Sequence, residues 1–130
     1  MNWRQWIYQK LTADPAVIAI VPAARIYSAG ALTGRVNTNP FLVIRMMPVN
    51  RELAEGVAHS QNVAIWAHDQ PGSYARIDAL LGAVRASLVG QVALPGAVAC
   101  RWQGDSQDLA DDGLGTITRN SAFVCMGTGN

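Results

Sequence analysis

Charge is scarce in this sequence of 130 residues. Lys, Arg, Asp and Glu make up 15% of it, well below the ~25% that is typical of soluble domains. The ten basic and nine acidic residues leave a net charge of +1, which excludes a strong overall field for nucleic acid or a membrane surface. Half of the residues are apolar, so we expect a partner to cover part of the surface. The alternative is a codon bias towards Ala and Arg.

Cysteines and long apolar runs are also few. The two cysteines, Cys100 and Cys125, lie in apolar segments without CxxC spacing or a neighbouring His, which predicts buried, reduced thiols. The longest apolar run, residues 16–24, is far shorter than the roughly 20 residues that cross a bilayer. No signal-peptide pattern opens the sequence. We therefore expect a soluble protein made in a cytoplasm, without a membrane partner and with one domain over residues 1–130.

The apolar spacing predicts helices in two parts of the chain. Four residues fall on one face of a helix over about residues 3–13; these are Trp3, Trp6, Ile7 and Leu11. Asp14-Pro15 is typical of an N-cap and first turn, and begins a short second helix that Pro22 ends. A longer helix is predicted over about residues 73–88, with Gly90 just beyond its end.

Several β-rich segments predict a sheet. The predicted strands are residues 25–27, 40–47, 62–68, 97–103 and 117–126. Residues 28–39 are predicted to be a loop, and residues 48–61 a long connection that could reach a neighbour as an arm. The sequence therefore predicts an α+β fold: a mostly antiparallel sheet of about four to five strands, with an N-terminal helix and one long central helix on one face.

His68-Asp69 is the first candidate for catalysis, because a carboxylate can orient a histidine base. Adjacent residues of a strand point to opposite faces, however, so the two side chains should not meet. The nearest nucleophile, Ser73, lacks a GxSxG turn. We expect instead that Asp69 or Ser73 caps the following helix, that Pro71 lies near its first turn, and that His68 is a surface residue at the strand end.

Metal and cofactor sites find little support. His59 has only Glu52 and Glu55 nearby, whereas zinc needs four ligands. Four carboxylates gather in a polar stretch between two predicted strands: Asp105, Asp108, Asp111 and Asp112. Their spacing lacks the glycine and late glutamate of a calcium loop. The stretch is either a solvated turn or a negative contact surface, for a basic patch on a neighbour or along a passage for DNA. No phosphate-binding loop is present, and we expect no cofactor.

Several segments together resemble the tail terminator, or tail completion, proteins of long-tailed bacteriophages. They are "ADPAVIAIVPAARIY", "PFLVIRMM", "VAIWAHD" leading into "YARIDALLGAVRASL", and "GTITRNSAFVCM". The similarity covers about residues 3–126 in order and spacing. Its motifs are patterns of apolar character, of which "RIY" and "WAHD" are the most recognisable.

The resemblance implies a structural virion protein without enzymatic activity. Such a protein is assembled in the host cytoplasm and forms a ring, expected to be a hexamer, at the head-proximal end of the tail. The ring stops polymerisation of the major tail tube protein and offers its other face to a head-completion protein, while DNA passes through the channel without sequence-specific binding. A closed ring needs head-to-tail contacts between different patches. Candidate contact residues are Arg51, Glu52, Glu55, Asp105, Asp108, Asp111 and Asp112.

Three alternatives stay open from the sequence. The protein could be a head-closure or adaptor component, or a minor tail protein, of the same machinery. It could be a small enzyme that uses His68 and Asp69. It could also be an ordinary monomeric domain, which the mass in solution would reveal.

Overall fold

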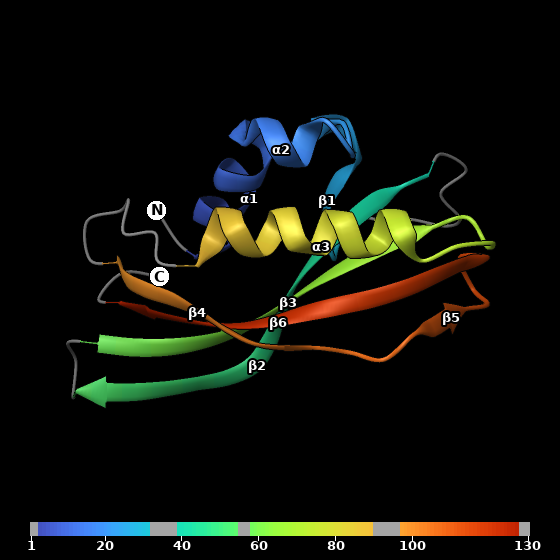
Figure 1. Ribbon diagram of the computed structural model, residues 1–130. Coiled ribbons are helices and arrows are strands. Elements are labelled where there is room, and N and C mark those ends of the chain that lie inside the picture. The colour runs from blue at the N-terminus through green and yellow to red at the C-terminus, as the bar shows by residue number, and fades with distance from the viewer. Residues whose placement is uncertain (1–2, 32–38, 55–57, 90–96, 128–130) are drawn as a thin grey trace.

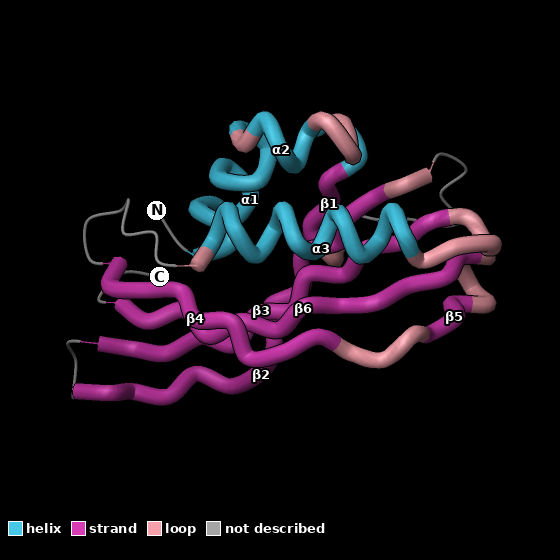
Figure 2. Tube along the Cα trace, in the orientation of Figure 1, coloured by secondary structure: helices cyan, strands magenta, loops and turns pink. Residues whose placement is uncertain are grey.

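The structure, a computed structural model, describes residues 3–31, 39–54, 58–89 and 97–127. Within these ranges, helices lie on one side of a six-stranded sheet (Figures 1 and 2). The elements in chain order are α1 (Trp3–Ala13), α2 (Pro15–Ile18), a 3-10 turn (Ala23–Arg25), β1 (Ile26–Ser28), β2 (Phe41–Ala54), β3 (Ala58–Asp69), α3 (Ala75–Leu88), β4 (Ala97–Asp105), β5 (Leu109–Asp111) and β6 (Thr116–Gly127).

The sheet has the strand order β1-β2-β3-β6-β4, and β5 also pairs with β6. Only the β1–β2 pairing is parallel; the other pairings are antiparallel. The predicted α+β class and mostly antiparallel sheet are confirmed. The sixth strand, β5, was not predicted: it lies within the polar stretch between β4 and β6, where three residues pair with residues 116–118.

The predicted arm at residues 48–61 is largely β-sheet, which corrects the prediction of a long connection. β2 continues to Ala54 and β3 begins at Ala58, so the two strands form one long hairpin. Its pairing shifts register between Met46 and Asn50, and again between Glu52 and Ala54. Figure 1 shows this hairpin extending beyond the end of α3. The sequence obscured the strands because polar residues interrupt the alternation there.

The N-terminal helices follow the predicted pattern. All four predicted apolar residues of α1 are buried. Asp14 caps α2, since its Oδ1 accepts a hydrogen bond of 2.9 Å from the backbone N–H of Ala16, and Pro15 occupies the first turn. The core between the helices and the sheet includes Leu42, Ile44, Ile65 and Phe123, each at most 1% exposed.

Helix α3 crosses the sheet and buries Ile77, Leu80, Leu81, Val84 and Leu88. The N-cap of the helix is Tyr74, which makes no side-chain capping hydrogen bond, so the prediction that Asp69 or Ser73 caps the helix is wrong. Ser73 lies one residue earlier, and its Oγ accepts a hydrogen bond of 3.1 Å from Ala75 N. Pro71 lies in the preceding turn, outside the first turn of the helix. Gly90, the predicted helix end, lies outside the described residues. No described helix is long and apolar enough to cross a membrane.

Candidate contact surface

The acidic stretch between β4 and β6 is held in place by several contacts. β5 pairs with β6, and the Tyr74 hydroxyl donates a hydrogen bond of 2.7 Å to Leu109 O. Asp111 Oδ1 accepts a hydrogen bond of 2.9 Å from Leu114 N, which stabilises the turn into β6. The stretch is therefore a fixed part of the sheet edge, more ordered than the solvated turn that the sequence left open.

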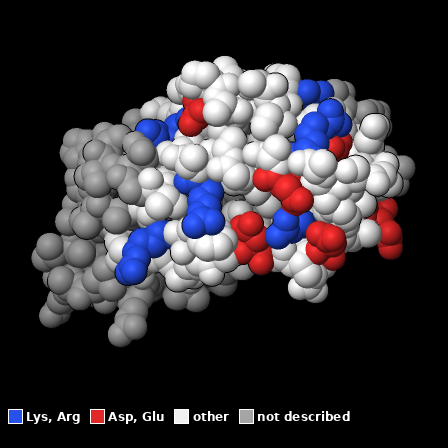
Figure 3. Space-filling view, viewed as in Figure 1, with Lys and Arg blue, Asp and Glu red and all other residues white. Residues whose placement is uncertain are grey.

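Three carboxylates from different elements surround the guanidinium of Arg119 on β6. Asp78 of α3 lies 2.5 Å away, while Asp105 and Asp108 approach to 3.9 and 3.7 Å. Arg119 Nε also donates a hydrogen bond of 3.0 Å to Ser106 O. Because three carboxylates meet one cation, the cluster keeps an excess of negative charge. Figure 3 shows acidic and basic atoms interleaved on this side of the molecule.

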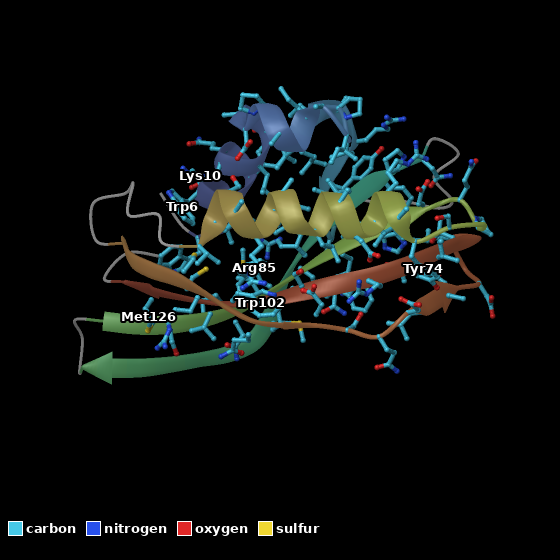
Figure 4. The ribbon with its side chains drawn as sticks, viewed as in Figure 1. Trp6, Lys10, Tyr74, Arg85, Trp102 and Met126 are labelled. Atoms are coloured by element: carbon cyan, nitrogen blue, oxygen red, sulfur yellow. The ribbon has the colours of Figure 1, made fainter. Side chains whose placement is uncertain are left out.

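The same cluster continues to Trp102 on β4. Trp102 Nε1 donates a hydrogen bond of 3.0 Å to Asp105, and the Ser121 hydroxyl donates another to that carboxylate. The guanidinium of Arg85 lies 3.6 Å from the centre of the Trp102 ring, which is a cation–π contact between α3 and β4 (Figure 4). Asp105 is thus committed to internal contacts.

The predicted contact residues fall into two separate groups. Asp105 and Asp108 meet at Arg119, whereas Asp111 ends β5 and pairs with Thr116, and Asp112 is exposed. Arg51 and Glu52 are in the hairpin, where they pair in register with Ser60 and His59. The structure describes only their backbone, and Glu55 lies outside the described residues. Sequence reasoning missed Arg119, Asp78 and Arg85, which come from elements far from the acidic stretch.

His68 and Asp69 lie on opposite faces of the sheet, as predicted. His68 is 4% exposed, which overturns the prediction of a surface residue. Its ring stacks on Phe41 with 4.6 Å between ring centres, and Nδ1 lies 2.8 Å from Thr116 Oγ1. Burial lowers the pKa of His68 from 6.5 to about 4, and the negative charge of Asp111 opposes this shift. The neighbouring strands β2 and β6 bury this side chain, although it lies one residue from the end of β3.

Asp69 points to the helix side and binds Arg76. Two hydrogen bonds, of 2.8 and 2.6 Å, join the guanidinium to the carboxylate. Burial alone would raise the pKa of Asp69, but the hydrogen bonds from Arg76 and from Gln70 N, with the charge of Arg76, hold that pKa below its usual value. The carboxylate therefore fixes the start of α3 and does not orient His68. This geometry gives no support to a catalytic pair.

The sheet face opposite the helices carries an apolar group, with Arg45, Asn62, Asn120 and Arg101 on the same face. Strand alternation and register place on it Val43, Ala64, Trp66, Ala122, Val124 and Met126. A hollow of about 230 Å³ opens here, lined by Val43, Arg45, Trp66, His68, Asp111 and Leu114. Trp66 Nε1 is buried without an acceptor in the described part of the chain.

A larger hollow of about 460 Å³ lies between the N-terminal helices and the end of α3. It is lined by Trp6, Gln9, Lys10, Ala13, Asp14, Pro15 and Ser87. Trp6 Nε1 and Ser87 Oγ are buried and find no hydrogen-bond partner among the described residues. Figure 4 shows Trp6 and Lys10 beside this end of α3. Buried polar atoms are normally paired, so these two atoms are exceptions among the described residues.

The chain is similar over nearly its whole length to a chain of a solved structure. A chain from the virion of the native gene transfer agent (GTA) particle aligns with a TM-score of 0.73 at 19% identity. The alignment covers 95% of this chain and 92% of that chain. No protein-family model matches the sequence, and no curated protein matches it. The similarity therefore supports the fold over nearly the full length of the chain.

Proposed function

We propose that this protein is a structural subunit of a virion that forms a ring on the end of a phage-type tail tube. The observation that carries the proposal is the end-to-end fold likeness to a chain of the GTA particle virion. The sequence resemblance to tail terminator proteins supports the same class independently. Together they favour a protein whose work is assembly, without catalysis or a cofactor.

The surface supports this role. Helices cover one face of the sheet (Figure 1). The other face carries the apolar group described above. We propose that a second copy of the chain covers this face within the ring, with Arg51, Glu52 and Glu55 of the hairpin region reaching across the contact. Such an interface would bury on the order of 1,000 Å² or more.

The acidic cluster is proposed as a docking edge or channel wall. Its carboxylates outnumber the guanidinium of Arg119, so a basic patch on a neighbour could bind there. Along a channel, the same negative charge would keep DNA from adhering, because phosphates gain affinity from Lys and Arg. We include Asp111 and Asp112 in this edge, and propose the tube protein and a head-completion protein as partners.

The test is the mass of the assembly in solution, measured with and without purified tube protein from the same genome. We expect rings, either alone or on the tube ends, and shorter tubes when the protein is present during polymerisation. A strict monomer that leaves tube length unchanged would contradict the proposal. A protein that forms rings but binds head components without affecting tubes would favour the head-closure or adaptor alternative.

A further inference from the structure

Cys100 and Cys125 come together although 25 positions separate them in the chain. They are direct partners in the register between β4 and β6. Their sulfur atoms lie 2.8 Å apart, and the residues are 1% and 0% exposed. The expectation of buried thiols is confirmed, since both cysteines are free and buried. Their proximity was not predicted, because it depends on which strands pair.

The backbone at this pair suits a covalent bond. Opposite residues of antiparallel strands have Cα atoms roughly 4.5–5.5 Å apart. A disulfide joins Cα atoms at roughly 4.4–6.8 Å. The two ranges overlap, so a bond between these cysteines needs no rearrangement of the sheet. Both thiols also lie in the core beneath the helices, on the same face.

Access to the pair depends on the edge of the sheet. Among the described strands, β4 ends the order and pairs only with β6. The hydrogen bond with Cys100 and burial raise the pKa of Cys125, so little Cys125 thiolate exists while the strands stay paired. Opening of β4 at the edge would expose both sulfurs to solvent and restore the ordinary acidity of Cys125. The reaction should therefore be slow in the closed sheet and faster when β4 opens.

We propose that Cys100 and Cys125 are a site of reversible oxidation, forming a disulfide that joins β4 to β6 when the surroundings become oxidising. The oxidant is a low-molecular-weight disulfide such as oxidised glutathione. One cysteine thiolate attacks it and releases one glutathione thiolate; the second cysteine thiolate then attacks the mixed disulfide and releases the other. Two thiol protons are lost, two electrons pass to glutathione, and one S–S bond replaces another. The proposal is independent of the function proposed above.

The test exposes the purified chain to oxidised glutathione, in buffer and in urea below the unfolding midpoint. The chain is then unfolded, alkylated with N-ethylmaleimide and weighed. We expect a monomer that has lost two hydrogen atoms and carries no maleimide, whereas the reduced chain carries an adduct on both of its cysteines. Dithiothreitol should restore both adducts. The bond should also raise the melting temperature of the oxidised chain, because a cross-link lowers the conformational entropy of the unfolded state.

The matched control is Cys125→Ala, which leaves Cys100 without its partner. Oxidised glutathione should leave this variant with a glutathione or maleimide adduct and should not raise its melting temperature. The wild-type comparison before and after dithiothreitol does not depend on the variant folding. The proposal is overturned if both cysteines of the wild type still take maleimide in buffer and in urea, or if only glutathione adducts or linked dimers form.

Discussion

At the scale of single residues, Arg119 links the acidic stretch to the rest of the fold. One side chain on β6 contacts carboxylates from α3, from the end of β4 and from the stretch itself. Its side chain is 22% exposed, so water screens these contacts only in part. Without the guanidinium, three carboxylates would face one another. Arg119 therefore holds the three carboxylates of the cluster close together.

We predict that Arg119→Met lowers the free energy of unfolding by about 1–2 kcal/mol, because charged hydrogen bonds are lost and the carboxylates repel each other. Urea unfolding measures the change. High salt should reduce the difference in unfolding free energy between the wild type and Arg119→Met, because it screens the repulsion between the carboxylates. The control is Arg101→Met, the same substitution at an exposed position of β4, for which we expect a change within about 0.5 kcal/mol. Equal effects of the two substitutions would show that the cluster adds nothing to stability.

His68 makes the stability of the protein depend on pH. Its pKa is lowered to about 4 in the folded chain, against 6.5 without burial. Between these values the unfolded chain binds a proton that the folded chain does not, so stability must fall as the pH falls from 6.5 towards 4. Above pH 6.5 both states are neutral, and this contribution is fully present.

We predict that His68→Gln removes about 1–2 kcal/mol from the difference in unfolding free energy between pH 7 and pH 5. Gln cannot titrate, and its amide can still form a hydrogen bond with Thr116. Other titrating groups, including His59, are present in both proteins and cancel in the comparison. Urea unfolding at the two pH values checks the prediction. The same pH dependence in both proteins would mean that the pKa of His68 is the same in the folded and unfolded states.

At the scale of elements, the sequence pattern predicted those helices whose formation depends on residues close together in the chain. The apolar period of α1, the Asp14-Pro15 start of α2 and the apolar face of α3 were all predictable, because each depends on residues within a few turns. The extension of the hairpin was missed because polar residues hide the alternation there. β5 was missed because a three-residue strand exists only through its pairing with β6.

The candidate site was harder to predict than the elements. The acidic residues are adjacent in sequence and visible as a group, whereas Arg119 and Asp78 join them only through the packing of α3 on the sheet. His68 was misjudged because its burial comes from Phe41 and Thr116 on the strands beside it. The cysteine pair likewise depends on register. Periodicity predicts the face on which a side chain lies, but not the strand that lies next to it.

At the scale of the whole molecule, the one-sided arrangement of layers is the central feature. All the described helices lie on one face of the sheet (Figure 2). The other face carries Trp66, Ala122, Val124 and Met126, all half-buried within the single chain. Arg45, Asn62, Asn120 and Arg101 share the face with this group. A neighbouring subunit that covers it would bury apolar surface, which drives most protein association.

This arrangement yields a prediction that compares one substitution at two positions. Ala122→Glu places a charge on the uncovered sheet face, between the small residues Ala64 and Gly104 of the adjacent strands. Ala79→Glu places the same charge on the exposed side of α3.

We expect the unfolding free energies of the two variants to differ by no more than about 1 kcal/mol in urea, since each new side chain can reach water. Ring formation and tube capping are measured by mass in solution and by electron microscopy. We expect the association constant of the assembly to be at least tenfold lower for Ala122→Glu than for Ala79→Glu, because about 1.4 kcal/mol at the interface changes an equilibrium constant tenfold. Normal assembly of Ala122→Glu beside defective assembly of Ala79→Glu would instead place the contact on the helical side.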